Sequence, residues 1–221
     1  MTATAAAAET SAAAGRPAAT RHLYLVRHAE ALADESGLTD RGRWQAELLG
    51  RRLRDVPLDA VHHGPLERAR QTARLVAGEL DDVPVRCDEA AGDYVPYFPS
   101  RDELPAKSAD RYLTFLEGAS AEERRDGPRL AREALERFSG PVAGDTERHE
   151  LVVTHNFLIG WLVRAAMGAR PWRWLGLNNA NAAVTMIRYM PDRPATLLLL
   201  NDMTHLPTDL RWTGLPREAT A

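Results

Sequence analysis

From residue 21 onwards, the hydrophobic residues alternate between the period of a β-strand and the period of an α-helix. Short β-prone runs such as 22–27 and 149–156 are separated by segments with apolar positions three or four apart, such as 64–80. A chain with this alternation forms a sheet whose faces are covered by helices. The pattern therefore predicts an α/β layer fold within one domain, because 221 residues are enough for one sizeable core.

The remaining elements follow from the same reading. Further strands are predicted at 58–63 and 83–87, a hairpin at 181–190 and 195–202, and helices at 38–55, 108–118, 121–138 and 157–167. Glycine and three prolines interrupt residues 88–107, which predicts a long loop. We expect this loop and the two helices after it to form an insertion around 88–140, beside the main sheet.

The first twenty residues are rich in Ala and Thr and lack both the basic start and the apolar core of a secretion signal. We expect residues 1–20 to be a disordered lead-in and residues 21–221 to form the domain. No apolar run approaches the roughly 18 residues of a membrane span. The single cysteine, Cys87, excludes an intramolecular disulfide and fits a reducing compartment as a packed side chain. These features predict a soluble, cytoplasmic protein that does not bind membranes.

Charge excludes one further class of partner. Lys and Arg number 28 and Asp and Glu number 31, so the net charge of −3 gives no general attraction for nucleic acid. Any basic site must be local. Nothing in the pattern indicates an oligomeric state.

Polar residues follow three of the predicted strands at the point where each strand ends. Arg27 and His28 end the first strand, His155 ends the strand at 149–156, and Arg68 opens the helix after 58–63. Each of these alone is most often part of a surface turn or helix start. In open α/β sheets, however, ligands bind beyond the carboxyl ends of the strands. The agreement of three strand ends therefore predicts a functional site at this edge.

These segments resemble a known family. "LYLVRHAE", "GPLERARQTA" and "VVTHN", in this order, resemble the signature segments of the histidine phosphatase superfamily, in the branch that includes cofactor-dependent phosphoglycerate mutases and small phosphatases. The helical segment "LTDRGRWQAELLG" is also similar, so that the resemblance spans about residues 22–190. It implies a phosphoglycerate mutase-like fold, a three-layer α/β/α sandwich with a mainly parallel central sheet.

The resemblance also implies roles for the four residues. His28 resembles the nucleophile that becomes a phosphohistidine, and Arg27, Arg68 and His155 resemble the groups that hold the phosphate. Arginine forks stabilise the charge that spreads over a phosphoryl group during transfer. Two guanidinium groups also disfavour protonation of His28, which keeps a lone pair for attack. This scheme requires no metal and no cofactor.

A carboxylic acid after the third strand supplies the leaving-group proton in this family. The segment "CDEAAGDY" offers Asp88, Glu89 and Asp93. We favour Glu89 as the proton donor because it resembles the acidic residue before the family's glycine-containing turn. Asp88 is the alternative.

Two positions depart from the family pattern, since Ala29 and Asn156 stand where the family has glycine. We expect Asn156 to bind substrate phosphate, although its amide is also suited to capping the following helix. His62 and His63 are predicted to be exposed turn histidines, or one of them lines the pocket. They do not have the i, i+4 spacing of a ligand pair, and without a cysteine cluster we expect no metal site.

The segment after the nucleophile is short, since only "AEALADESG" separates His28 from Leu38. Mutases of the family resemble one another in a longer segment here, which retains the phosphorylated intermediate and excludes water. We therefore expect a metal-independent phosphoric monoester hydrolase of the histidine acid phosphatase type. Phosphoglycerate mutase-type transfer and a catalytically silent phosphate-binding protein are the alternatives.

The substrate is predicted only as a class, a small phosphorylated molecule or a phosphoprotein. Specificity is expected to lie in the loop at 90–107, where Tyr94, Tyr97 and Phe98 either wall a pocket or pack the loop. The aromatic segment 171–181 either forms a rim or anchors the last strands.

Overall fold

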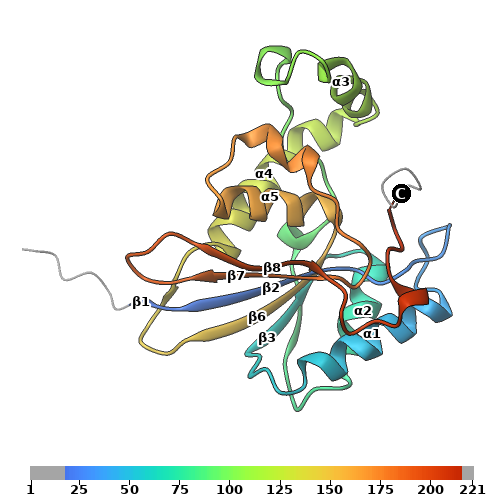
Figure 1. Cartoon of the computed structure of the whole chain (residues 1–221), viewed down its shortest axis with the longest axis vertical. Helices are drawn as coiled ribbons and strands as arrows, with labels where there is room; N and C mark the ends of the chain where they lie inside the picture. The colour runs from blue at the N-terminus through green and yellow to red at the C-terminus, as the bar shows by residue number, and fades with distance from the viewer. Residues whose placement is uncertain (1–17, 216–221) are drawn as a thin grey trace, which may run out of the picture.

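The centre of the protein is a six-stranded sheet in the order β4-β3-β6-β2-β7-β8. The computed structural model describes residues 18–215 (Figure 1). The strands are β2 (Arg21–Arg27), β3 (Ala60–His63), β4 (Val85–Cys87), β6 (Arg148–Thr154), β7 (Val184–Tyr189) and β8 (Thr196–Asp202). The first four strands in the sheet order are parallel, whereas β7 and β8 are antiparallel to their neighbours. The predicted mainly parallel sheet is confirmed.

Helices cover both faces of the sheet, as Figure 1 shows. The helices are α1 (Asp40–Leu53), α2 (Glu67–Ala77), α3 (Ala109–Glu117), α4 (Ala121–Phe138) and α5 (Asn156–Ala166). Helices α1 and α2 pack on one face and α4 and α5 on the other, while α3 stands above α4. Short 3-10 turns complete the fold: η1 (Glu89–Ala91), η2 (Arg101–Glu103), η3 (Pro171–Gly176) and η4 (Thr208–Leu210). The result is a three-layer α/β/α sandwich.

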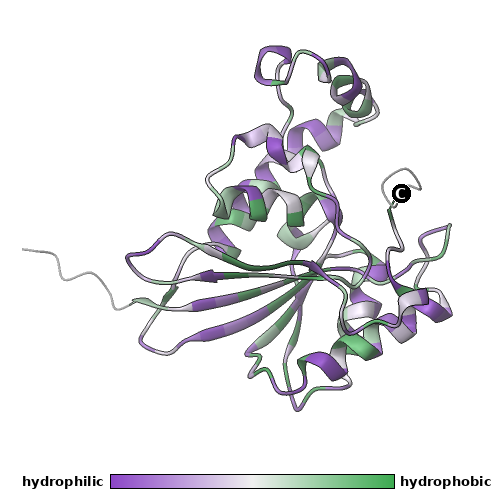
Figure 2. Ribbon diagram, in the orientation of Figure 1, coloured by the Kyte–Doolittle hydropathy of each residue, from purple (hydrophilic) through white to green (hydrophobic). Residues whose placement is uncertain are grey.

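Strand β2 shows why its sequence is almost continuously apolar. Leu23 and Leu25 belong to the core cluster under α4 and α5, whereas Tyr24 and Val26 belong to the cluster under α1 and α2. Because successive side chains of a strand point to opposite faces, a strand covered on both sides buries every residue. Figure 2 shows hydrophobic residues along the strands in the middle of the sheet.

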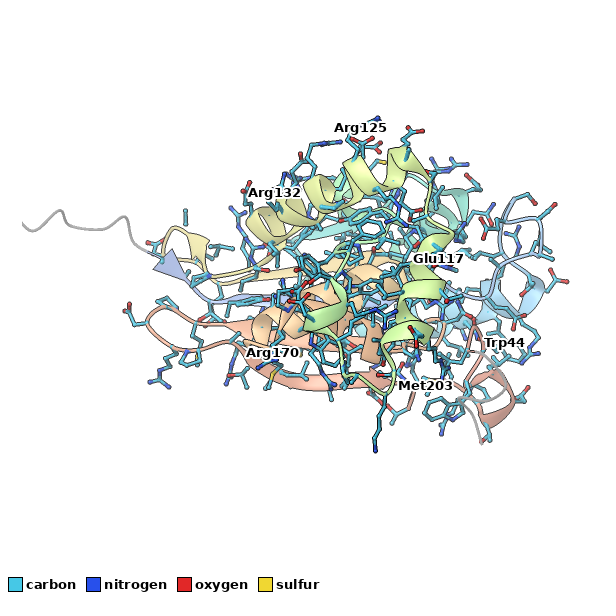
Figure 3. The ribbon with its side chains drawn as sticks, turned by 90° about the horizontal axis from the view of Figure 1, so that it is seen from above. Trp44, Glu117, Arg125, Arg132, Arg170 and Met203 are labelled. Carbon is cyan, nitrogen blue, oxygen red and sulfur yellow. The ribbon has the colours of Figure 1, made fainter. Side chains whose placement is uncertain are left out.

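Helix α4 belongs to the sandwich and does not stand beside it. Ala131, Ala134 and Phe138 lie in the same core cluster as Val152 of β6. Its exposed side carries charged residues such as Arg125 and Arg132 (Figure 3). The predicted insertion around 88–140 is therefore too broad, and α3 with the loop before it is the part that projects.

Three smaller findings concern the ends and edges of the domain. Residues 18–20 were predicted to be disordered, yet β1 (Ala18–Ala19) pairs with β5 (Val142–Ala143). The rest of the expected lead-in, residues 1–17, lies outside the described residues. Cys87, on edge strand β4, is exposed and not packed as expected. Among residues 18–215, the structure contains no helix with the length and apolarity to cross a bilayer.

Candidate active site

The carboxyl edge of the parallel strands brings together the residues that the sequence placed there. His28 follows β2, His155 follows β6 at the start of α5, and their ring centroids lie 5.0 Å apart. Arg68 lies in the first turn of α2 with its Nε 3.2 Å from Nε2 of His28. His28, Arg68 and His155 are only 7%, 5% and 1% exposed. Arg27, His28 and His155 line one cavity at this edge.

The hydrogen bonds around His28 fix its ring and its tautomer. Nδ1 donates to the carbonyl of Ala29 at 2.8 Å, which leaves the lone pair on Nε2. The backbone is held by Thr154, whose carbonyl accepts from His28 N at 2.9 Å, and by Asn181, whose amide donates to the His28 carbonyl at 2.7 Å. Burial, His155 and the two arginines place the pKa of His28 well below its ordinary value. The His28 imidazole is therefore neutral at pH 7.

The guanidinium of Arg68 is in contact on three sides. Its Nε donates to His28 Nε2 at 3.2 Å, its NH1 donates to Glu35 at 2.9 Å, and its NH2 donates to Asp93 at 2.8 Å. Charge-assisted bonds of this kind orient the planar fork. An anion that binds Arg68 therefore either uses the second N–H of NH1 or NH2 or replaces one of these carboxylates.

Arg27 is held by backbone carbonyls from the far end of the chain. Its NH1 donates to Asn179 O at 2.8 Å and to Gly214 O at 2.7 Å. The segment containing Gly214 is in turn fixed by the bond from Asn181 N to Thr213 O, at 3.0 Å. These carbonyls occupy one nitrogen of Arg27 and set the orientation of the others. Asn179, Asn181 and Gly214 were not predicted as site residues, and the only sequence signal for them is the polar run "NNAN" at 178–181.

The carboxylate in the site is Asp93, and the two acids favoured from the sequence lie elsewhere. Asp93 Oδ2 lies 2.8 Å from Arg68 NH2 and 3.4 Å from His155 Nδ1. Glu89 is exposed on η1 and does not line the cavity. Asp88 caps η1 through Ala90 N and pairs with Arg137. The prediction of Glu89 as proton donor, with Asp88 as alternative, does not fit this geometry.

Close backbone contacts explain how Asp93 reaches the site. Gly64, after β3, lies so close to the carbonyl of Ala91 that a Cβ there would be 2.3 Å from it. The same carbonyl accepts a bond from Thr154 Oγ1 at 2.7 Å. On the other side, a Cβ on Gly127 of α4 would lie 2.3 Å from Val95 O. Two glycines thus allow the loop that carries Asp93 to pack between β3, β6 and α4.

The two remaining titratable groups of the site are shifted in opposite senses. Desolvation raises the pKa of Asp93, although Arg68 and Arg27 oppose this shift. Burial, with smaller effects of Arg68 and Arg27, lowers the pKa of His155 to about 3. His155 is therefore neutral at pH 7, and Asp93 is the carboxyl group of the site whose pKa lies above its ordinary value.

A cavity of about 380 Å³ opens above His28. Its outer wall comes from α3, α5 and η3, with the side chains Arg111, Tyr112, Phe115, Phe157 and Trp174. The Phe157 ring lies edge-on to Phe115 and Trp174, with centroids 5.8 and 5.0 Å away. Part of the segment 171–181 thus forms a wall, while Trp172 packs with Leu104 and Ala109 of the projecting part.

The predicted wall residues of the 90–107 loop do not line this cavity. Tyr94 is buried and donates to Ala90 O at 2.7 Å, Tyr97 donates to Glu103 at 2.7 Å, and Phe98 lies under the guanidinium of Arg124. They pack the loop, which was the alternative reading.

Three other predicted residues have structural contacts. Asn156 lines the cavity, but its Oδ1 accepts from Asn179 N at 2.8 Å. His62 and His63 are buried and not exposed as expected, and they point to opposite faces of β3. His62 packs edge-on against Phe138, and His63 Nδ1 bonds to Gly64 O at 2.7 Å. Neither histidine lines the cavity.

The comparisons with known proteins agree with this geometry. A family model described as histidine phosphatase superfamily (branch 1) matches residues 23–202. The chain belongs to this superfamily. Among curated proteins, it is 27% identical over 207 residues to the mitochondrial serine/threonine-protein phosphatase Pgam5 of Drosophila willistoni, covering 90% of this chain and 68% of that protein. It is 25% identical over 204 residues to PGAM5 of Xenopus laevis, covering 88% and 70%.

Solved structures confirm the phosphoglycerate mutase-like fold. Phosphoglycerate mutase from Plasmodium falciparum superposes with a TM-score of 0.58 at 19% identity, covering 86% of this chain and 96% of that one. Alpha-ribazole phosphatase from Shigella flexneri gives 0.60 at 23% identity, covering 82% and 96%. Figure 1 shows the layered arrangement of this chain.

The same comparisons correct one expectation. The prediction of a cytoplasmic protein is wrong, because the comparisons contradict it: the curated relatives are named as mitochondrial proteins. Charge balance and the lack of an apolar core near residue 1 do not distinguish these compartments.

Proposed function

We propose that this protein is a phosphoric monoester hydrolase of the histidine acid phosphatase type, which forms a phosphohistidine on His28 without a metal. One observation carries the proposal. The neutral His28 Nε2 lies beside Arg68 in a buried site that also holds a protonatable carboxylate, Asp93. A nucleophile, an anion clamp and an acid are the three groups that this chemistry needs.

In the first step, phosphate binds between Arg27, Arg68 and His155, and Nε2 of His28 attacks phosphorus. The N–P bond forms as the P–O bond to the leaving group breaks. Asp93 gives its proton to the leaving oxygen. Phosphate binding assists this transfer, because the dianion takes the place of Asp93 on Arg68 and thus raises the pKa of Asp93 further. The arginines stabilise the charge on the transferring group.

In the second step, water attacks the phosphohistidine. The Asp93 carboxylate accepts a proton from the water, the new P–O bond forms, and the N–P bond breaks. Phosphate leaves, and Asp93 is protonated for the next cycle. The carbonyl of Ala29 keeps its hydrogen bond to Nδ1 of His28 throughout, so that Nε2 has its lone pair again after the N–P bond breaks.

The phosphatase assignment is favoured over mutase chemistry by the names of the curated relatives, which are serine/threonine-protein phosphatases. We extend this to the substrate and propose a phosphoserine or phosphothreonine side chain. The cavity of about 380 Å³ leaves room beside the phosphate for such a side chain, against Tyr112 and Phe115. A small phosphorylated metabolite is the second candidate, since the cavity is also the size of a small-molecule site.

The test is hydrolysis of p-nitrophenyl phosphate with a chelator, compared between the wild type and His28→Ala. We expect activity that survives the chelator and disappears in the variant. Activity that the chelator abolishes, or that survives in His28→Ala, would contradict the proposal. A phosphoserine peptide and a phosphorylated sugar, assayed side by side, then separate the two substrate classes.

A further inference from the structure

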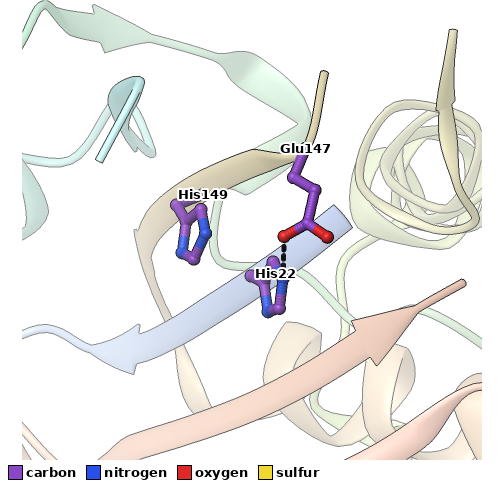
Figure 4. A group of neighbouring side chains, drawn as sticks. All are labelled: His22, Glu147 and His149. Atoms are coloured by element: carbon purple, nitrogen blue, oxygen red, sulfur yellow. Dashed lines mark hydrogen bonds and ion pairs between the residues drawn. The ribbon is translucent and has the colours of Figure 1, made fainter. Parts of the chain in front are cut away.

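A second group of histidines lies at the opposite edge of the sheet from the catalytic site. His22 is near the start of β2 and His149 near the start of β6, and the parallel register places them side by side. Glu147 precedes His149 by two positions, which is the spacing that directs two side chains of an extended segment to one face. Figure 4 shows His22, Glu147 and His149 together on this face.

The distances within this group are short enough for its three side chains to share one ion. One ligand atom from each of His22, Glu147 and His149 lies within 4.8 Å of the other two. His22 Nε2 is 3.1 Å from Glu147 Oε2, and the rings of His22 and His149 stack at 4.2 Å between centroids. A rotation of the exposed Glu147 side chain and a small rotation of the imidazoles would bring the three atoms to the spacing of a tetrahedral ion.

The charges also suit a cation. Glu147 provides one negative charge. Asp59 lies beside the group, where its Oδ2 accepts from His149 N at 2.8 Å. Two carboxylates thus flank the two imidazoles.

Surrounding contacts support one of the two imidazoles. Tyr24 OH lies 3.3 Å from His149 Nδ1 and so selects which nitrogen of that ring is available. Within residues 18–215, the buried Nδ1 of His22 has no hydrogen-bond partner, so His22 would bind an ion without this support.

We propose that His22, His149 and Glu147 form a binding site for a divalent cation of the zinc type. Two imidazoles and one carboxylate are a known zinc donor set, with the fourth position left to water. The site lies roughly 20 Å from the nucleophile, given the six residue steps along the strand from His22 to His28. It therefore takes no part in the metal-free chemistry proposed above. Its effect is to join the amino ends of β2 and β6.

The first test is titration of the tag-free protein with Zn²⁺ at pH 7.5 against a chromophoric zinc indicator. We expect one micromolar or tighter site per chain that 1 mM Mg²⁺ does not displace. His22→Asn and His149→Asn should each weaken it at least about tenfold, and Glu147→Gln should weaken it less. His205→Asn is the matched control. It changes a histidine that follows β8 and contacts Arg52, and it should bind zinc as the wild type does.

The catalytic histidines are the competing zinc ligands, and a variant distinguishes them. The double variant His28→Asn/His155→Asn should keep the site. A site that is lost in this double variant and kept in His149→Asn would overturn the proposal, as would binding weaker than about 100 μM in the wild type. A zinc-dependent rise in Tm that disappears in His149→Asn would support it independently, because a ligand of the native state stabilises that state.

Discussion

The two edges of the sheet carry the same residue type on the same two strands and differ in what surrounds it. At the carboxyl edge, His28 and His155 are almost fully buried beside Arg27 and Arg68. At the amino edge, His22 and His149 lie partly buried beside Glu147 and Asp59. Guanidinium groups make the first pair a receptor for an anion, whereas carboxylates make the second pair suitable for a cation. The neighbours, and not the histidines, determine the ligand.

The largest expected effect tests the acid at the carboxyl edge. Asp93→Asn should reduce kcat/KM for an alkyl phosphate such as a phosphoserine peptide by about 10²- to 10⁴-fold, because the alkoxide leaving group needs a proton. The loss for p-nitrophenyl phosphate should be much smaller, since its leaving group is stable without one. Glu89→Gln is the matched control and should change both rates by less than about twofold. Equal losses on both substrates in Asp93→Asn would show a structural role.

The next effect tests the arginine that makes this edge an anion site. Arg68→Ala should lower kcat/KM by about 10²- to 10³-fold, as expected when a preorganised charge donor is removed. Arg70→Ala changes an arginine on the same helix that pairs with Glu67, and should leave kcat/KM within about twofold. Steady-state kinetics with p-nitrophenyl phosphate measures both. An unchanged rate constant in Arg68→Ala would remove Arg68 from the site.

Burial of the catalytic pair also predicts how stability depends on pH. The pKa of His155 is about 3 in the folded protein and about 6.5 when unfolded, so the unfolded chain binds more protons between these values. Stability should therefore fall as the pH drops below 6.5, by about 1.4 kcal/mol per pH unit for this group. Urea unfolding at pH 7 and pH 5 should show His155→Asn losing about 2 kcal/mol less than the wild type. Equal losses in the two proteins would contradict this assignment.

A smaller effect is expected from Glu35, because a carboxylate at the carboxyl edge competes with the substrate, whereas a carboxylate at the amino edge is proposed to bind the ion. Glu35 occupies NH1 of Arg68 in the free protein, and its side chain is 67% exposed. Glu35→Gln should lower KM for a phosphate ester by up to about fivefold, because an exposed ion pair that competes with substrate is worth at most about 1 kcal/mol. Asp34→Asn, whose carboxylate bonds only to neighbouring Ser36 among residues 18–215, should leave KM unchanged. A raised KM in Glu35→Gln would instead make Glu35 a positioning residue.

The smallest expected effect is at the amino edge. His149→Asn should leave kcat/KM for p-nitrophenyl phosphate within about twofold, because six strand residues separate the two edges. The same protein sample should show the weakened zinc binding described above. A large loss of turnover would mean that the edges are coupled through β2 and β6.

Much of this arrangement was predictable from the sequence, because strand ends and helix starts are local features. The helix predicted at 38–55 is α1, and its cap is local as well, because the Thr39 side chain accepts from Gly42 N. Arg27, His28, Arg68 and His155 each follow a recognisable strand or begin a helix, so the fold rules place them at one edge. Their predicted roles remain a proposal that the experiments above test.

One physical reason explains why neither the position of Asp93 nor the group of His22, Glu147 and His149 was predictable. Asp93 is placed by contacts of its loop with Gly64, Gly127 and Thr154, which come from three different elements. His22 and Glu147 are 125 positions apart, and only the pairing of β2 with β6 brings them together. Spacing along the chain carries information about neighbours in one element and little about register between elements.

The hydrogen bond from Arg27 to the carbonyl of Gly214 joins a residue made early in translation to one made late. The nucleophile is made early, since it follows the first strand of the central sheet, whereas the carbonyl that orients Arg27 comes 187 positions later. A chain still on the ribosome thus has His28 without its finished clamp, because domains fold as units after their last elements emerge. In the proposed mechanism, Arg27 gains this contact only after Gly214 has been made, so we expect a chain that ends before Gly214 to bind phosphate more weakly.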